Sequence, residues 1–242
     1  MKKIKLSKLL QAQGFGARRA CEVMILDGRV RVSGELATDP GALVLAEALP
    51  VEVDGAPWTC RAHLYVALNK PPNYECSRKP SHHRGVLSLF PSMFSLRNIQ
   101  PVGRLDHDTT GMLLLSDDGQ FIHRQASPKH YVPKTYEATT LDPVTPDLIA
   151  SLLAGVLLHD EPKPIAAAAC RQLGPRRLEI VLEQGKYHQV KRMLAAVDNR
   201  CEALTRTAIG KLWLKDLGLA EGEWRFLTDA QLRFLAPDAR KE

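Results

Sequence analysis

The middle of the chain reads Val102-Gly-Arg-Leu-Asp-His-Asp-Thr-Thr-Gly-Met-Leu-Leu-Leu115. A polar part with two glycines leads directly into four apolar residues, so we expect a buried strand over residues 112–115 with Asp106 in the loop before it. Glu75 is the last carboxylate before Asp106, and the basic residues between them are Arg78, Lys79, Arg84, Arg97 and Arg104. Such flanking cations suit an acid that acts on a polyanion, because they hold phosphates and keep the acid ionised. Composition alone favours a simpler role, in which Asp106 caps a turn and pairs with Arg104.

The positive charge is concentrated at the beginning of the chain. The 242 residues carry a formal net charge of +6, and residues 1–31 alone hold eight basic and two acidic residues. A basic N-terminal segment in a chain that is otherwise nearly neutral indicates a polyanionic partner, because contacts with phosphates release condensed counterions. A solvated face that binds no partner explains the charge equally well, so more specific features must decide.

The five cysteines are far apart in the sequence, with no C-x-x-C pair. This spacing argues against a disulfide framework and a zinc cluster, so we expect a reducing cytoplasm and no bound metal. No apolar run approaches the length that crosses a bilayer, and residues 1–8 lack the apolar core of a signal peptide. We therefore expect a cytoplasmic protein without a membrane partner.

The hydrophobic pattern predicts two domains, at residues 1–60 and 61–242. The first is expected to contain a short helix with the stripe Leu6, Leu9 and Leu10, a helix over residues 17–26, strands over residues 29–33 and 51–53, and a linker over residues 56–63. A unit this small buries little apolar surface alone, so its arginines are available for binding.

The second domain is expected to be α+β, on a largely antiparallel sheet, because it has many strands and few helices. The predicted elements are strands over residues 64–68, 112–115, 134–139 and 178–182, a helix from Pro146 to Gly155 capped by Thr145, and a final helix with a capping box of Thr228 and Gln231. The prolines between residues 71 and 101 predict an irregular, exposed segment.

Three stretches of the first domain resemble the alpha-L RNA-binding motif, which is known from a small-subunit ribosomal protein and several RNA-modifying enzymes. They are Lys5-Leu-Ser-Lys-Leu-Leu10, Ala17-Arg-Arg-Ala20 and Gly28-Arg-Val-Arg-Val-Ser-Gly34. The resemblance implies a small α+β RNA-binding domain. Its expected RNA contacts are Lys5, Lys8, Arg18, Arg19, Arg29 and Arg31.

The run from Val102 to Leu115 closely resembles the active-site signature of the pseudouridine synthases, in which an aspartate follows Arg-Leu. The resemblance implies that Asp106 is the nucleophile, and that Arg104 holds the displaced RNA backbone or fills the place of the flipped base. It also implies a catalytic domain on a mixed, largely antiparallel sheet that isomerises uridine without a cofactor. The residues leave open whether Asp106 attacks the pyrimidine ring or the anomeric carbon of the sugar.

Two further segments agree with this family in order and spacing. Lys134-Thr-Tyr136 resembles the strand whose tyrosine stacks on the target base, although a strand tyrosine can equally face a core. In the second segment, Glu183 to Met193, Lys191 matches the basic residue that pairs with the catalytic aspartate, where it would keep Asp106 deprotonated and oriented. His188 and Arg192 lie on the same polar side of the predicted helix, and we expect both to contact RNA.

The branch most resembled is the RsuA family, whose members modify small-subunit 16S rRNA. The resemblance rests on Ser127-Pro-Lys-His130 and on the run from Tyr187 to Met193; large-subunit relatives usually have an Asn-Arg pair where Tyr187-His188 stands. Asn73 occupies a position where glycine is common, and the sequence assigns it no consequence. We expect rRNA, free or in an assembly intermediate, to be the partner of a monomeric protein.

Three other functions remain compatible with the sequence. The first is a pseudouridine synthase that acts on 23S rRNA, and the second is a non-catalytic RNA-binding assembly factor. The third is a metal-dependent nuclease or phosphotransfer enzyme that uses the D-x-D pair Asp106 and Asp108. Activity that persists in the presence of a chelator would exclude the third.

Overall fold

The computed structural model describes residues 3–77, 79–126 and 132–236. The chain forms two compact units, each built from segments that are separate in the sequence. The first comprises residues 1–64, 87–100 and 116–118, and the second comprises residues 65–86, 101–115 and 119–242. The domain boundary placed between residues 60 and 61 stays a prediction.

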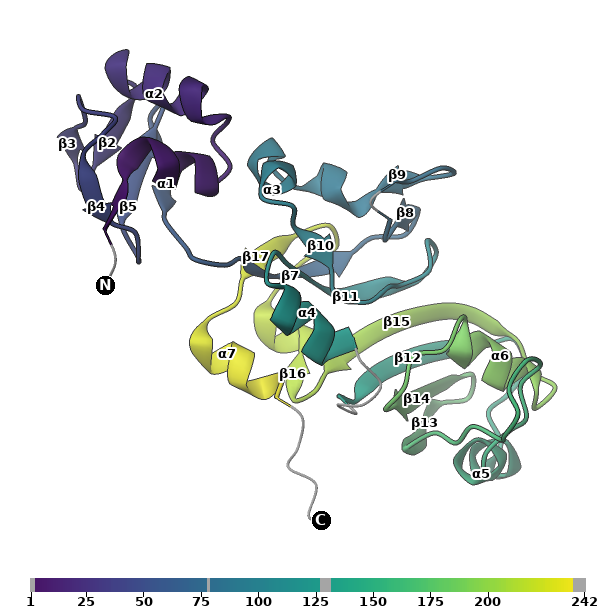
Figure 1. Cartoon of the computed structure of the whole chain (residues 1–242). Helices are drawn as coiled ribbons and strands as arrows, with labels where there is room; N and C mark the ends of the chain where they lie inside the picture. Colours follow the sequence, from purple (N-terminus) through teal and green to yellow (C-terminus); the bar gives the residue numbers. More distant parts are fainter. Residues whose placement is uncertain (1–2, 78, 127–131, 237–242) are drawn as a thin grey trace. The chain divides into compact units, whose positions relative to one another are not determined.

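The part of the first unit formed by residues 3–64 contains two helices and a four-stranded antiparallel sheet (Figure 1). Its elements are β1 (Lys3–Lys5), α1 (Leu6–Ala12), α2 (Arg18–Leu26), β2 (Val30–Val32), β3 (Glu35–Leu36), β4 (Leu43–Leu45), β5 (Pro50–Val53) and β6 (Ala56–Thr59). The sheet has the order β3-β2-β5-β6, and β1 pairs with β4 beside it. The predicted stripe Leu6, Leu9 and Leu10 is buried against Ile25 and Val51. Both predicted helices of this region are therefore confirmed.

The predicted linker over residues 56–63 is wrong at its beginning, because residues 56–59 form β6. Asp54 and Gly55 have φ angles of 54° and 78°, and Val53 pairs directly with Ala56 across them. A two-residue turn with positive φ at both positions connects hairpin strands, and Asp-Gly is among the sequences that favour it. The sequence interpretation took this turn as the end of a strand.

The proline-containing segment before residue 101 is also more regular than predicted. It includes β8 (Tyr74–Glu75), β9 (Arg84–Gly85), the 3-10 helix η1 (Val86–Leu89) and α3 (Ser92–Leu96). Pro91 is the N-cap of α3, and Phe94 in that helix is fully buried and stacks on Phe90 with ring centroids 5.4 Å apart. The prolines therefore delimit short elements here, and aromatic burial stabilises them.

Arg97, one of the basic residues before Asp106, serves the interior of the first unit. Its side chain is only 3% exposed and contacts Asp117 at 2.6 Å. It also donates to the side chain of Gln13 and to the backbone carbonyls of Arg61 and Ala62. A buried, fully hydrogen-bonded arginine of this kind connects distant segments, so Arg97 is a structural residue.

The second unit is organised by a nine-stranded sheet with the order β13-β14-β12-β15-β11-β7-β17. These strands are β7 (Tyr65–Lys70), β11 (Thr110–Ser116), β12 (Lys134–Thr140), β13 (Ala169–Gly174), β14 (Arg177–Leu182), β15 (Cys201–Ile209) and β17 (Trp224–Phe226); β10 (Gln100–Pro101) pairs with β11 and β16 (Leu212–Trp213) with β15. β11 and β15 are parallel, whereas β12 is antiparallel to both β14 and β15. The predicted α+β fold on a mixed, largely antiparallel sheet is confirmed.

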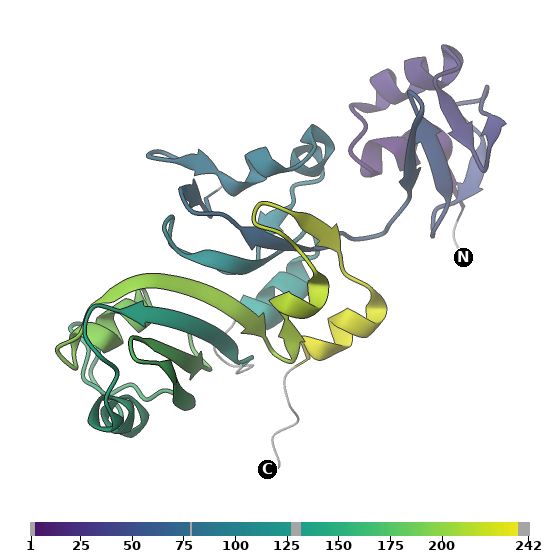
Figure 2. The same cartoon turned by 180° about the vertical axis from the view of Figure 1, so that it is seen from behind.

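Helices cover parts of this sheet (Figures 1 and 2). They are α4 (Gly119–Ala126), α5 (Pro146–Ala154), α6 (Gln189–Ala195), the 3-10 helix η3 (Leu214–Leu217) and α7 (Asp229–Phe234). The Thr145 side chain accepts from the backbone N–H of Leu148, and Thr228 and Gln231 form a capping box, as predicted. Leu152 of α5 and Met193 of α6 pack with Ile180 of β14 in one core. This core ends beside the site described below.

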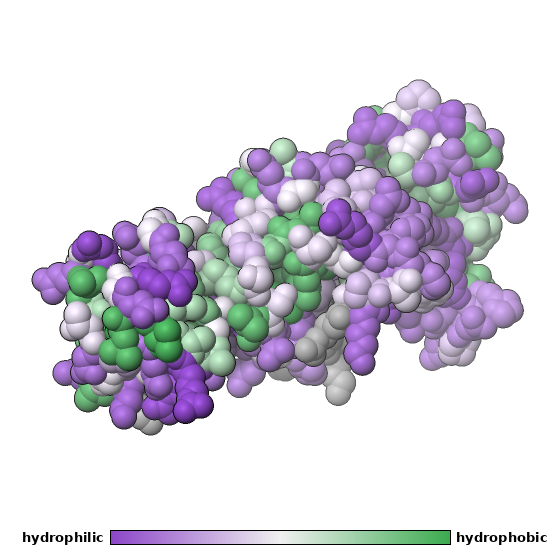
Figure 3. Space-filling view, turned by 90° about the horizontal axis from the view of Figure 1, so that it is seen from above, coloured by the Kyte–Doolittle hydropathy of each residue, from purple (hydrophilic) through white to green (hydrophobic). Residues whose placement is uncertain are grey.

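No helix in the described part of the chain is long and apolar enough to span a membrane. On the face drawn in Figure 3, hydrophilic side chains predominate and apolar ones gather in small groups between them. Scattered apolar side chains are normal on a protein surface.

Candidate active site

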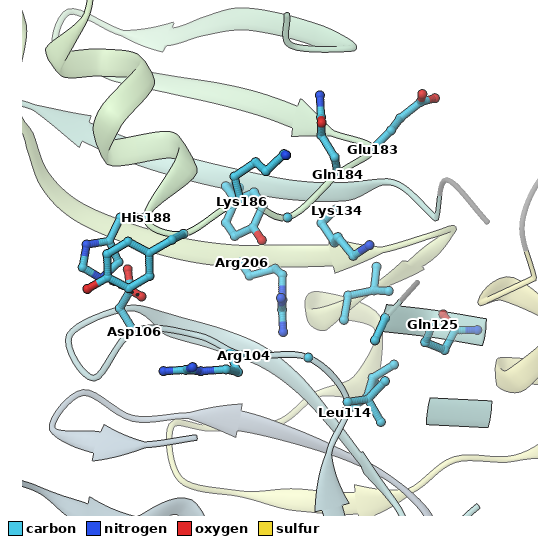
Figure 4. Close-up of a pocket in the computed structure, with 17 residues that line it drawn as sticks. Arg104, Asp106, Leu114, Gln125, Lys134, Glu183, Gln184, Lys186, His188 and Arg206 are labelled. Carbon is cyan, nitrogen blue, oxygen red and sulfur yellow. Dashed lines mark ion pairs between the residues drawn. The ribbon is translucent and has the colours of Figure 1, made fainter. Parts of the chain in front are cut away.

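A cavity of about 570 Å³ opens in the second unit. Its wall comes from the loop before β11, from β12 and β15, and from the segment before α6. Figure 4 shows Asp106 and His188 at one end, Gln125 at the other, and Arg206 between them. The cavity is large enough for a small molecule or a single nucleotide.

The side chains at the bottom of the cavity lie on the same face of the sheet as the hydrophobic core. Tyr136 of β12 pairs directly with Ile180 of β14 on one side and with Arg206 of β15 on the other. Because side chains alternate along a strand, Lys134 and Tyr136 project from the same face of β12. The same face is therefore apolar beneath α6 and becomes polar and cationic where the helix no longer covers it.

The loop that carries Asp106 is fixed at both ends. The backbone N–H of Thr109 donates to the carbonyl of Asp106 at 3.2 Å and closes a turn. Gly111 pairs with Arg206 in parallel register at φ 97°, and a Cβ at this position would collide with the Arg206 carbonyl oxygen. Glycine is therefore required where β11 leaves the loop and approaches β15.

Lys70, at the end of β7, holds the other side of this loop. Its side chain is fully buried, and the ammonium donates to the carbonyls of Pro71, His107 and Thr109 at 2.9, 3.0 and 2.9 Å. Burial lowers the pKa of Lys70 below its ordinary value. The sequence interpretation missed this residue, although a lysine that ends an apolar strand was a signal for it.

Replacing Lys70 by Met is expected to lower the free energy of unfolding by about 2–4 kcal/mol, because three carbonyls lose a charged donor. The turnover of bound substrate should fall as well, since residues 107–109 support Asp106. Chemical denaturation and single-turnover rates measure the two effects. Lys163→Met, at an exposed position, is the matched control. Equal stability of the two variants would contradict the role given to Lys70.

Asp106 lies in a cluster of charged side chains. One carboxylate oxygen is 3.1 Å from Nε2 of His188, and the other is 3.4 Å from Nζ of Lys191. The Asp106 side chain is 25% exposed, so a substrate can reach it. The structure thus brings together Asp106 and Lys191, which the sequence had paired, and it adds His188, which was predicted only as an RNA contact.

Lys191 has a second and closer partner in Asp108, whose carboxylate oxygens lie 2.7 and 2.8 Å from Nζ. Burial lowers the pKa of Lys191, but the hydrogen bond that it donates to Asp108 and the charge of Asp106 outweigh this effect and raise the pKa overall. The pKa of Asp108 is lowered: burial raises it, but Lys191 outweighs that effect. An ammonium thus contacts both carboxylates of the D-x-D pair, where a metal-dependent enzyme would need a metal ion. Among the described residues, no group of three or more His, Cys, Asp or Glu side chains is placed to hold a metal ion.

Lys134 and Arg206 also line the cavity, and the sequence had assigned neither of them a role in the site. Burial, together with the charge of Arg206, lowers the pKa of Lys134 from 10.5 to about 8. The positive charge of the cavity therefore decreases as the pH rises through about 8. Arg206 is only 3% exposed. Leu204 and Arg206 project from one face of β15, and a charge at an inward-facing position was the available signal.

The remaining predicted RNA contacts differ in their surroundings. Arg104 is exposed and lines the cavity, whereas Arg192 donates to the carbonyls of Tyr187 and His159. Lys5, Lys8, Arg18, Arg19, Arg29 and Arg31 are all exposed in the first unit. Arg29 is held by both oxygens of Asp54, and Arg18 pairs with Glu22. Exposure and ion pairs do not test RNA binding, so the RNA-binding roles of these six residues stay predictions.

Asn73, which the sequence analysis could not interpret, has a φ of 64°. Its backbone N–H donates to the carbonyl of His107 at 2.7 Å. Asparagine is one of the few residues other than glycine that tolerate this conformation, so either residue suits this position. Ser127 to His130, which contributed to the resemblance, lie outside the described residues.

Comparisons with known proteins agree with this geometry. A family model described as RNA pseudouridylate synthase matches residues 64–196, and an S4 domain model matches residues 4–49. Two proteins named ribosomal small subunit pseudouridine synthase A, from Salmonella typhimurium and Escherichia coli strain K12, are each 38% identical over 95% of this chain and 98% of their own. A solved structure of a pseudouridylate synthase aligns at 32% identity with a TM-score of 0.68, over 96% of this chain and 100% of its own. The chain belongs to the RNA pseudouridylate synthase family.

Proposed function

We propose that this protein converts one uridine of small-subunit 16S rRNA into pseudouridine, acting as a monomer in the bacterial cytoplasm. The observation that carries the proposal is the partly exposed Asp106 carboxylate at the end of a cationic cavity, 3.4 Å from Lys191 and 3.1 Å from His188. Asp106 acts as the nucleophile, Lys191 orients it, and Tyr136 stacks on the target base.

The reaction begins when the target uridine leaves its stack and enters the cavity. Unstacking costs a few kcal/mol, which stacking on Tyr136 and contacts with cations offset. The C1′–N1 bond then breaks, the uracil turns, and a C1′–C5 bond forms while C5 loses its proton and N1 gains one. Atoms and electrons balance within the nucleotide, so the isomerisation itself requires no cofactor. Asp106 supplies the attacking oxygen, at either the ring or the sugar.

The choice of small-subunit rRNA rests on similarity. The Salmonella typhimurium and Escherichia coli relatives named above carry this subunit in their names and align over nearly their full length. The pair Tyr187-His188 stands where large-subunit relatives usually have Asn-Arg. In this structure the two rings stack with centroids 3.8 Å apart, and His188 contacts Asp106. The pair therefore belongs to the cavity wall, where it can influence which RNA is accepted.

Release of tritium from rRNA labelled at C5 of uridine tests the proposed activity, because that hydrogen leaves whenever pseudouridine forms. We expect release that continues with a chelator present. If no tritium is released, cleavage of the RNA that stops with the chelator would favour metal-dependent chemistry at Asp106 and Asp108, and an unchanged RNA would favour an RNA-binding assembly factor.

The exposed arginines of the first unit are expected to supply affinity and positioning. Changing Arg18 and Arg19 to Ala should weaken rRNA binding. The slope of the logarithm of the binding constant against the logarithm of the salt concentration should become shallower by roughly 0.7 to 0.9 for each phosphate that is no longer neutralised. The single-turnover rate at saturating protein should change little, because Asp106, Tyr136 and Lys191 are untouched. Binding of an rRNA fragment at several salt concentrations measures the slope.

The matched control is the double variant Arg171→Ala and Arg177→Ala, which removes the same charge from exposed ion pairs of the second unit. It should leave the salt slope nearly unchanged. An unchanged slope in the Arg18 and Arg19 variant would instead mean that the basic face is only solvated.

A further inference from the structure

Arg206 is a buried guanidinium whose hydrogen bonds are incompletely satisfied. Its Nε donates to the carbonyl of Met112 at 2.7 Å, but its buried Nη2 has no hydrogen-bond partner within the described residues. Leaving a buried charged donor unpaired costs free energy, so such a group usually has a partner that the structure does not contain. Arg206 forms part of the cavity wall and projects toward the cavity between Asp106 and Leu114 (Figure 4).

The position of Arg206 is set by the sheet rather than by a flexible loop. It pairs with Tyr136 on one side and with Gly111 on the other, and its guanidinium carbon lies 6.0 Å from the centre of the Tyr136 ring. The guanidinium lies over the Tyr136 ring, so a base that binds against Tyr136 comes within reach of it. Arg104, by contrast, is an exposed side chain of the cavity wall.

We propose that Arg206 donates a hydrogen bond to a carbonyl oxygen of the target uracil and stabilises the negative charge that the ring acquires during the reaction. This inference rests on the proposed function. If Asp106 attacks the sugar, the electron pair of the C1′–N1 bond leaves with the base and is shared with O2 and O4. If Asp106 adds to C6, the electron pair of the C5–C6 bond moves to O4. Both routes place charge on a carbonyl oxygen, and a fixed cation in a dry site stabilises that charge.

The first test compares Arg206→Met and Arg206→Lys with the wild type. We expect the single-turnover rate to fall about 10²-fold in Arg206→Met, the effect of removing one donor to a developing oxyanion, and less in Arg206→Lys. RNA affinity should stay within about threefold, because the first unit supplies the phosphate contacts. Arg176→Met is the matched control, since its Nε also donates to a backbone carbonyl, that of Thr140, but it lies outside the cavity.

The second test changes the substrate. Target uridines with sulfur in place of O2 or O4 accept hydrogen bonds poorly at the sulfur. Sulfur also makes the uracil anion more stable, so a slower reaction reflects the weakened hydrogen bond and not a less stable anion. In wild-type protein we expect one of the two thio substrates to react about tenfold more slowly than uridine. In Arg206→Met, which removes the donor, this ratio should largely disappear. Because the wild-type comparison needs no variant, it remains decisive if a variant fails to fold, which thermal denaturation detects.

Three results would overturn the inference. If both thio substrates react with wild-type protein at least as fast as uridine, no donor contacts the carbonyls. If the rate ratios are equal in wild type and Arg206→Met, the donor is not Arg206. If Arg206→Met weakens RNA binding and its salt slope but keeps the saturated rate, the residue contacts a phosphate. Failure of wild-type protein to modify unsubstituted rRNA would overturn the proposed function as well, so the two failures are distinguishable.

Discussion

Asp106→Asn is expected to reduce pseudouridine formation by at least about 10³-fold, close to the limit of detection, while RNA binding stays near normal. The amide has the same shape as the carboxylate but cannot act as an oxygen nucleophile. Nζ of Lys191 keeps its closer partner, Asp108, at 2.7 Å, so the loop should keep its structure. Single-turnover assays, RNA affinity and thermal denaturation separate these effects.

Asp108→Asn is the matched control, because it changes the other carboxylate of the same loop by the same atoms. Its side chain is 52% exposed and outside the cavity wall, so the loss of rate should be much smaller. Wild-type turnover in Asp106→Asn would show that the nucleophile is misassigned. Equal losses in the two variants would mean that the carboxylates act only together.

Lys191→Ala is expected to reduce the single-turnover rate by about 10²-fold, because the change leaves Asp106 and Asp108 near each other without a cation. Lys191→Arg should retain part of the activity, since the guanidinium keeps the charge but has a different shape. The pKa of Lys191 is raised, so its charge is present throughout the range from about pH 6 to 9. The ratio of wild-type to Lys191→Ala rates should therefore be nearly constant over that range.

Rates measured between those pH values test this expectation. A Lys191→Ala variant as active as wild type at every pH would exclude the pairing with Asp106. Titration of Lys134, whose pKa is lowered to about 8, occurs in both proteins and should leave the ratio unchanged.

Local signals in the sequence predicted much of the fold. The apolar run after Asp106 forms β11, and Thr145, Gly155 and the pair Thr228 with Gln231 mark helix ends where predicted. Each of these features depends on residues within a few positions of one another, so a single sequence contains the needed information. The comparisons confirmed the predicted family.

The parts of the site that the sequence did not predict depend on strand register. Tyr136 and Arg206 lie opposite each other only because β12 and β15 pair with an irregularity between Thr135 and Tyr136. Register across so many residues is set by packing of the whole sheet face, which no local pattern specifies. Lys70 is a similar case, because two of its three acceptors, the carbonyls of His107 and Thr109, lie far from it in the sequence.

The measurement that tests the central claim most directly is mapping of pseudouridine in unmodified 16S and 23S rRNA after incubation with the protein and a chelator. Selective chemical labelling of pseudouridine, read by reverse transcription, locates each modified position. Our account predicts one modified uridine in 16S rRNA, none in 23S rRNA, and none in either with Asp106→Asn. Modification confined to 23S rRNA would contradict the proposed target, and unmodified RNA in every reaction would contradict the proposed activity.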